Sequence, residues 1–274
     1  MWRLAAVGLA VLALAGCAGN DDDPNDHAVV AAFYPLAWVA EHVGGDEIEV
    51  VNLTPAGAEP HDLELSPRDV ETLRDAELVV YAGRGFQPAV EDAVETRDGR
   101  SLDVLRAGER DPHVWLDPLR FASVADRIAG ALGRPDGARE VSSALGLLDV
   151  ELRRGLERCE RRTIVTTHAA FAHLATRYGL TQLSLAGSSP ESDPGPRELE
   201  QLVEEVRASG ATTVFAEPLV SDRLAETVAR EADATVAVLD PLEGLSEDRL
   251  DAGEDYLTVM RDNLTALREG LGCR

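Results

Sequence analysis

The stretch TIVTTHAAFAHLATRY (residues 163–178) contains, in direct succession, a strand pattern, a histidine and a helix pattern. The β-branched residues 163–167 predict a buried strand, and His168 follows it directly. Residues 169–178 predict a helix that stops at Gly179, because glycine readily adopts the left-handed conformation that closes helices. Open parallel sheets gather their binding groups at the carboxyl ends of strands, so His168 is a candidate site residue.

The alternation of strands and helices continues in both directions from this stretch. Buried strands that read as near-continuous apolar runs between helices imply a parallel sheet, so the sequence predicts an α/β fold. The other predicted strands are residues 28–33, 48–53, 78–81, 101–105, 180–185, 212–216 and 235–239. The predicted helices are residues 36–43, a helix that begins at 67 after the capping Ser66, and residues 117–132, 196–209, 221–231 and 255–270.

A long amphipathic helix is expected in the middle of the chain, from about residue 138 to residue 160, after a break at residues 133–135. Its apolar positions recur every three or four residues, which is the helical period. They are Val141, Leu145, Leu148, Leu152 and Leu156. We therefore expect two parallel-sheet α/β lobes, residues 28–135 and 161–274, joined by a single long helix at 136–160, with a plain crossover helix as the alternative.

The amino terminus has the pattern of a targeting segment. Arg3 precedes an apolar run at residues 4–15 that is too short to span a bilayer comfortably, and the run ends in LAGC. This lipobox predicts a lipoprotein signal peptide at residues 1–17 with lipidation of Cys17, followed by a flexible polar tether at 18–27. The expected location is outside the cytoplasm, lipid-anchored to the outer face of the cell membrane. An ordinary secretory signal with an incidental cysteine is the alternative.

The net charge limits the possible partners of the protein, and the cysteines offer a candidate disulfide. The 274-residue chain carries a net charge of −24, which argues against nucleic acid as a partner because phosphates would repel this surface. Cys159 and Cys273 are the two cysteines that remain after Cys17. In an oxidising compartment they are candidates for a disulfide that pins the C-terminal helix to the connecting helix, with two free thiols as the alternative.

Three histidines and an aspartate lie far apart in the sequence but in matching settings. His168 and Asp240 directly follow predicted strands, His61 lies in the loop after the second strand, and His113 lies in a proline-flanked turn before a helix. These four positions can converge in the cleft between two lobes. Three imidazoles and one carboxylate suit a borderline-soft divalent cation such as zinc.

Several carboxylates near these positions are candidates for a supporting role. Asp62, Asp111 and Asp117 could orient the imidazole rings, and Glu59 and Glu217 could contact the metal from cleft loops. Each of these residues could instead be an ordinary turn, cap or surface residue. The remaining histidines are expected to be surface or packing residues: His27, His42 and His173.

Six ordered motifs resemble the metal-binding lipoproteins of bacterial zinc and manganese ABC importers, the cluster 9 solute-binding proteins. The resemblance covers essentially the whole mature chain. It rests on NLTPAGAEPHD (52–62), SPRD (66–69), DPHVWLDP (111–118), HAAF (168–171), FAEP (215–218) and LDPL (239–242). The resemblance implies two α/β lobes joined by one rigid helix with the metal between them. It assigns the three histidine positions to His61, His113 and His168, and the carboxylate position to Asp240.

The resemblance also implies a function. The protein is expected to be the extracytoplasmic solute-binding component of a metal ABC importer, a monomer that captures Zn²⁺ and passes it to a membrane permease and its ATPase. A histidine-rich ligand set favours zinc over manganese, and manganese-type members tend to carry a carboxylate where this chain has His168. Many zinc-type members have a histidine-rich loop before the second ligand, but residues 105–111 are short and lack histidine.

Three other functions are weighed against this one. A manganese-binding member of the same family would differ only in its cargo. An adhesin or metal sensor could use the same fold. An extracellular zinc hydrolase would need an open coordination position, but Asp240 would close it and no HExxH motif is present. We therefore expect a protein that is not an enzyme.

Overall fold

The computed structural model describes residues 28–187 and 194–274. The predicted signal peptide (1–17), its Cys17 and the tether (18–27) lie outside the described residues. Within the described ranges, no helix combines the length and the apolar character needed to cross a bilayer.

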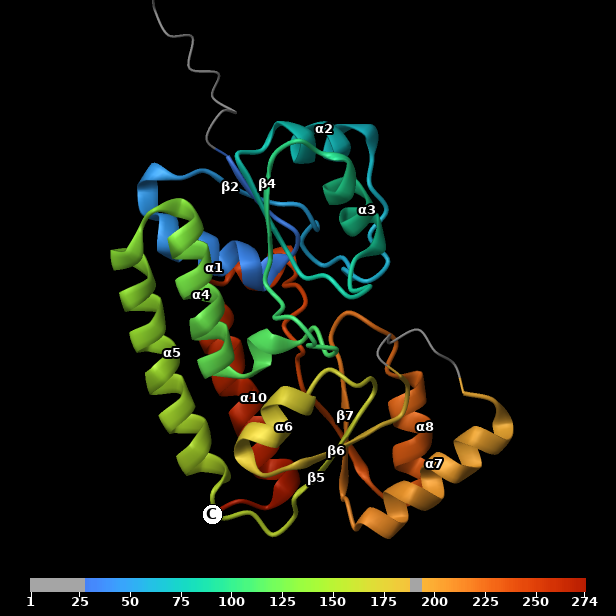
Figure 1. The fold of residues 1–274 in the computed structure, drawn as a ribbon. Helices are drawn as coiled ribbons and strands as arrows, with labels where there is room; N and C mark the ends of the chain where they lie inside the picture. The colour runs from blue at the N-terminus through green and yellow to red at the C-terminus, as the bar shows by residue number, and fades with distance from the viewer. Residues whose placement is uncertain (1–27, 188–193) are drawn as a thin grey trace, which may run out of the picture.

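The chain folds into two lobes, each built on a four-stranded parallel sheet (Figure 1). The first sheet contains β1 (Val29–Ala31), β2 (Val50–Asn52), β3 (Leu78–Tyr81) and β4 (Arg100–Asp103), in the spatial order β2-β1-β3-β4. The second contains β5 (Thr163–Thr166), β6 (Thr181–Ser184), β7 (Thr213–Ala216) and β8 (Thr235–Val238), in the order β6-β5-β7-β8. The two sheets share one topology, and the predicted two-lobe α/β fold is confirmed.

Helices flank both sheets (Figure 1). The first sheet has α1 (Tyr34–Gly44) on one side and α2 (Pro67–Asp75) and α3 (Pro88–Thr96) on the other. The second has α6 (Ala172–Tyr178) and α10 (Tyr256–Leu271) on one side and α7 (Pro196–Ser209) and α8 (Arg223–Ala232) on the other. Short elements complete the chain: η1 (Gly45–Glu47), η2 (Val114–Leu116) and α9 (Glu247–Asp251). α3 and α9 are not among the helices predicted from the sequence.

Two antiparallel helices connect the lobes. α4 (Pro118–Leu132) ends at Gly133, whose φ of 69° is left-handed, and α5 (Pro135–Leu156) begins two residues later. The long helix thus begins at Pro135 and not at residue 138, because proline is well tolerated at the first position of a helix. All five predicted apolar positions of α5 are buried, and α5 packs against α1, α4 and α10. The connecting helix is therefore part of a packed helical layer that runs beside both lobes.

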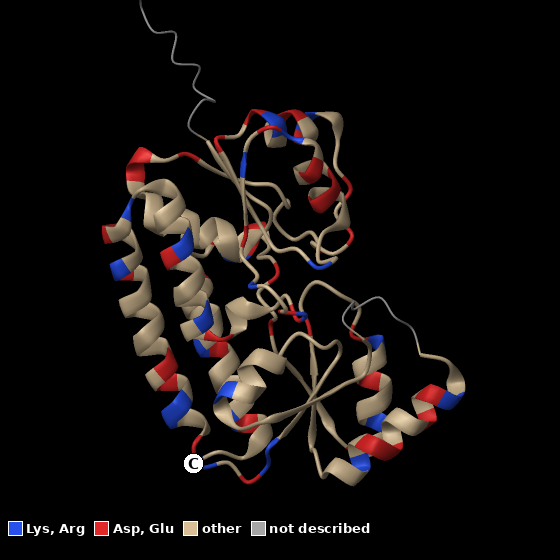
Figure 2. Cartoon of the chain, viewed as in Figure 1, with Lys and Arg blue, Asp and Glu red and all other residues tan. Residues whose placement is uncertain are grey.

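Charged residues are scarce in the second sheet and frequent on the helices around it. In Figure 2 the strands of the second sheet are almost free of charged residues, whereas acidic and basic residues are spread along the helices. Apolar strand residues such as Val79, Val80, Ile164, Val165 and Val214 are fully buried, or nearly so, between the layers. The net charge of −24 is therefore carried mainly by solvated helix surfaces and loops.

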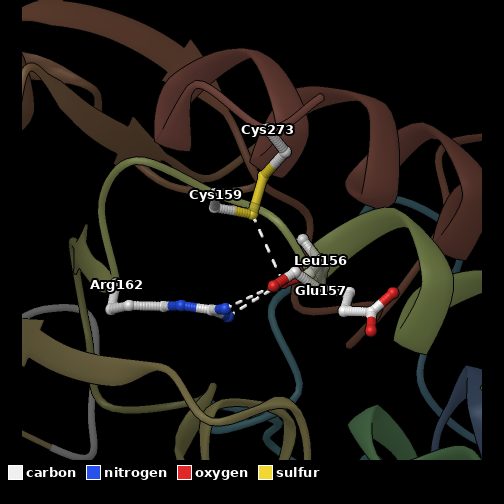
Figure 3. The surroundings of a disulfide bond; sticks show 5 residues. All are labelled: Leu156, Glu157, Cys159, Arg162 and Cys273. Atoms are coloured by element: carbon white, nitrogen blue, oxygen red, sulfur yellow. Dashed lines mark hydrogen bonds between the residues drawn. A yellow bond between two sulfur atoms is a disulfide. The ribbon is translucent and has the colours of Figure 1, made fainter.

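A disulfide joins Cys159, just after α5, to Cys273, just after α10 (Figure 3). The backbones of these two ends also pair, with the Arg274 N–H donating to the Arg158 carbonyl at 3.0 Å. Beside the bridge, the Arg162 guanidinium donates to the Leu156 carbonyl at 2.8 Å, which caps the end of α5. The predicted link between the connecting helix and the C-terminal helix is confirmed.

We expect the bridge to stabilise the fold by about 2–4 kcal/mol, because it closes a long loop in the unfolded chain. Cys159→Ser, Cys273→Ser and the double variant should lower the free energy of unfolding by similar amounts, measured by urea denaturation. Thiol labelling of the denatured, unreduced protein, mapped by peptide mass, should leave Cys159 and Cys273 unmodified. Labelling of both, with unchanged stability in the variants, would contradict the bridge.

Candidate metal centre

Four side chains from loops at the carboxyl ends of four strands meet between the lobes. They are His61, His113, His168 and Glu243, which follow β2, β4, β5 and β8 respectively. Each offers one ligand atom, and these atoms all lie within 4.8 Å of one another. The rings of His113 and His168 are completely buried, Glu243 is 1% exposed and His61 is 10% exposed.

The carboxylate oxygen lies at a similar distance from each of the three imidazole nitrogens. Oε1 of Glu243 lies 3.4 Å from Nε2 of His61, 3.0 Å from Nε2 of His113 and 3.3 Å from Nε2 of His168. Bonds of about 2.0–2.1 Å to a tetrahedral zinc would place the ligand atoms about 3.3 Å apart. The second oxygen of Glu243 is buried and has no hydrogen-bond partner within the described chain. The donor set and its spacing therefore fit a four-coordinate divalent ion.

Asp111 fixes the orientation of the His113 ring. Its Oδ1 lies 2.7 Å from Nδ1 of His113 and also accepts from the His113 backbone N–H at 3.1 Å. With Nδ1 engaged in this way, Nε2 faces Glu243. His173, expected to be a packing or surface residue, lies behind this pair, with Nε2 3.1 Å from the Asp111 carbonyl oxygen.

Glu217 has the corresponding role for His168. Its Oε2 lies 2.6 Å from Nδ1 of His168, and its Oε1 accepts from the His168 backbone N–H at 3.1 Å and from the Thr167 hydroxyl. Both oxygens of Glu217 thus lie on the Nδ1 side of the His168 ring and face away from the cluster of ligand atoms. A carboxylate behind a ligand imidazole fixes its tautomer and raises its basicity.

His61 is held differently from the other two histidines. No side chain in the described ranges accepts a hydrogen bond from its Nδ1. Its ring packs edge-on against Phe86, with ring centroids 4.4 Å apart, and its backbone N–H donates to Glu59 at 3.1 Å. It is also the most exposed of the four. His61 is thus the least constrained member of the cluster.

The pKa values in the cluster are set by burial and by the contacts between its ionisable groups. Burial alone would lower the pKa of His168, but its contacts with Glu217 and Glu243 outweigh burial and raise that pKa to about 10. Burial alone would raise the pKa of Glu243, but the three imidazoles lower it well below its ordinary value. Burial and the nearby Glu243 raise the pKa of Glu59 to about 8. In the metal-free protein at neutral pH, Glu243 is therefore ionised, and His168 and Glu59 hold protons.

The structure brings the three predicted histidines together but not Asp240. Both oxygens of Asp240 are engaged elsewhere: Oδ1 accepts from the Leu242 backbone N–H at 2.7 Å, and Oδ2 accepts from Arg249 at 2.5 Å. The carboxylate in the cluster is Glu243, three residues further along the same loop. Glu243 is not among the residues predicted from the sequence, although its position in the Asp-Pro-Leu-Glu-Gly segment after a strand was an available signal.

The other candidate carboxylates have separate positions. Asp62 is exposed and makes no hydrogen bond or ion pair with any of the three rings. Asp117 caps α4, accepting from the backbone N–H groups of Leu119 and Arg120, and pairs with Arg177. The predicted role of Asp62 and Asp117 in orienting the imidazoles is therefore not supported by the geometry, since neither makes a hydrogen bond or ion pair with a ligand ring. Glu59 touches the backbone of His61 and not its ring nitrogens.

Two parallel-sheet lobes with a buried His₃Glu cluster between them define a bilobal protein with a metal-binding site. A comparison with known protein families identifies the family to which this chain belongs. The family model described as "Zinc-uptake complex component A periplasmic" matches residues 29–270, and the chain belongs to this family.

Named relatives agree with this assignment. The chain is 31% identical over 300 residues to the zinc-binding lipoprotein AdcA of Streptococcus pneumoniae, covering 97% of this chain but only 60% of the length of AdcA. It is 30% identical over 288 residues to the high-affinity zinc uptake system protein ZnuA of Bacillus subtilis, covering 92% of this chain and 90% of ZnuA. The laminin-binding protein Lmb of Streptococcus agalactiae, described as an adhesin with metal-transporting activity, is 31% identical and superposes with a TM-score of 0.81 over 89% of this chain and 99% of Lmb.

The raised pKa of His168 yields a direct test. In the metal-free protein we expect its ring to stay protonated through pH 8 and to lose its proton only near pH 10, measured by NMR of histidine ring nuclei. Glu217→Gln removes one of the two carboxylates that stabilise the imidazolium and should lower that pKa. A midpoint at or below the ordinary value of about 6.5 in the unaltered protein would contradict this electrostatic description.

Proposed function

We propose that this protein captures Zn²⁺ outside the cytoplasm and delivers it to the membrane permease of an ABC importer, which works with its own ATPase. The observation that carries the proposal is the buried cluster of three Nε2 atoms that lie 3.0–3.4 Å from Oε1 of Glu243. Family membership and relatives named for zinc binding and zinc uptake support it. The proposed ligands are His61, His113, His168 and Glu243.

Ligand chemistry favours zinc over manganese as the cargo. Imidazole nitrogens suit zinc, whereas manganese prefers carboxylate, carbonyl and water oxygens. The proposed set offers three nitrogens and one carboxylate. A manganese-specific protein would be expected to present more oxygen ligands at these positions.

The same set argues for transport and against catalysis. A catalytic zinc usually has three protein ligands and keeps a fourth position open for water. Here a buried fourth ligand, Glu243, is already in place, and Glu217, a candidate base, has both oxygens turned to His168 and its neighbour. We therefore propose a carrier with no hydrolytic activity.

We further propose that metal exchange occurs through His61. His113 and His168 are completely buried and supported by carboxylates, whereas His61 is partly exposed and lies in a loop of the first lobe. Contacts between the lobes, such as the Gly57 N–H donating to the Leu245 carbonyl at 2.9 Å, oppose large lobe opening. Local movement of the His61 loop would expose the ion while the other ligands stay fixed.

The proposed cellular context follows from the amino terminus. A lipid on Cys17 would anchor the protein to the outer face of the cell membrane, next to the permease. The tether at residues 18–27 would give the folded lobes freedom to reach it. We propose that the carrier acts there as a monomer.

Removal of a proposed ligand should weaken zinc binding. For His168→Ala we expect at least about a tenfold loss of zinc affinity, measured by competition with a chromophoric chelator, because a buried ligand is lost. His42→Ala is the matched control, since His42 lies on α1 and bonds to the Trp38 carbonyl at 2.7 Å, away from the cluster. Equal affinities for the two variants would remove His168 from the site.

Delivery can be tested separately in cells. A strain that lacks this gene but keeps the permease should grow poorly under zinc chelation, and the wild-type gene should restore growth. The His168→Ala gene, expressed at the same level, should not restore it, whereas His42→Ala should. Full rescue by a variant that fails to bind zinc in vitro would contradict a carrier function.

A further inference from the structure

Glu243 reaches the histidines through a sharp turn that most residues avoid. The chain leaves β8 at Val238, and Leu242, directly before Glu243, has a φ of 57°. This is the left-handed region, which is unfavourable for a side chain such as leucine. Leu242 is fully buried, so the conformation has to be maintained by its surroundings.

Asp240 makes the contacts that maintain this turn. Its Oδ1 accepts from the Leu242 backbone N–H at 2.7 Å, which closes a side-chain turn across Pro241. Its Oδ2 accepts from the Arg249 guanidinium at 2.5 Å, and Arg249 is itself paired with Glu254 at 2.7 Å. Asp240 is only 5% exposed, so the ion pair fixes the carboxylate in one orientation.

The backbone on both sides of this turn is held as well. Asn263 on α10 accepts from the Asp240 N–H at 2.8 Å and donates to the Asp240 carbonyl at 2.7 Å. From the other lobe, the Trp115 indole N–H donates to the Pro241 carbonyl at 2.7 Å. The backbone at residues 240 and 241 is therefore held by hydrogen bonds from Asn263 and Trp115, whereas the Leu242 N–H is held by Asp240.

We infer that Asp240 is a positioning residue, which holds the left-handed turn at Leu242 and thereby aims Glu243 at the three histidines. This inference rests on the proposed metal-binding function. It gives the buried aspartate a role in metal binding that needs no contact with the metal. Arg249 supports that role by keeping the carboxylate of Asp240 turned toward the Leu242 N–H and away from the cluster.

The inference predicts that Asp240 acts only through Glu243. Asp240→Ala should weaken zinc binding at least about tenfold in the wild-type background, which is typical for loss of a residue that positions a ligand. In the Glu243→Ala background the same change should have almost no effect on affinity, because the side chain that the turn positions is absent. A merely structural role would cost a similar factor in both backgrounds.

Spectroscopy and matched variants sharpen the test. The visible absorption of bound Co²⁺ reports its coordination, so the Asp240→Ala and Glu243→Ala spectra should resemble each other and differ from the wild-type spectrum. Asp240→Asn keeps an oxygen for the Leu242 N–H but loses the ion pair with Arg249, so its loss of affinity should be smaller than that of Asp240→Ala. Asp251→Ala removes the same charge from an exposed position on α9 and should bind like the wild type.

If Asp240→Ala does not fold, Arg249→Gln replaces it in the same cycle, with a smaller expected loss that again disappears in the Glu243→Ala background. Wild-type zinc affinity in Asp240→Ala, an unchanged Co²⁺ spectrum or equal losses in both backgrounds would overturn the inference. Failure of the wild-type protein to bind zinc would instead overturn the proposed function.

Discussion

The structure depends on the burial of one carboxylate among three imidazoles. A buried ionised group is very unfavourable unless it is paired and hydrogen-bonded. Glu243 meets this condition because all three Nε2 atoms lie within 3.4 Å of its Oε1. Asp111 and Glu217 then satisfy the far sides of two of the rings. The interior between the lobes can therefore be polar and yet fixed in shape before any ion arrives.

The fold supplies the convergence that this cluster needs. Parallel strands direct their carboxyl ends to one edge of a sheet, and the two lobes turn those edges toward each other. α5 packs against both α4 and α10, and the disulfide joins the ends of α5 and α10. Contacts such as Trp115 to the Pro241 carbonyl then tie a loop of one lobe to a loop of the other.

Much of the fold, and the positions of the histidines in the cluster, could be predicted from the sequence because they depend on local patterns. Apolar β-branched runs identify the strands, and a histidine after such a run, as at His168, falls at the binding edge of the sheet. The choice between Asp240 and Glu243 could not be made in this way. It depends on a left-handed Leu242, on Arg249 from α9 and on Asn263 from α10, and no pattern within the loop reports those distant partners. For Asp62, proximity in sequence to a histidine was misleading, because neighbouring side chains in a loop can point in opposite directions.

Charge balance explains how one arrangement can serve both the empty and the loaded site. Without metal, the pKa of about 10 keeps a proton on His168, and the pKa of about 8 keeps one on Glu59. These protons offset the negative charge of Glu243 and its neighbours. A divalent ion would bring two positive charges and would compete directly for Nε2 of His168, so proton loss would accompany its arrival. Loss of the His168 proton would offset one of the two positive charges, so the cluster would gain about one positive charge beside the ionised Glu243.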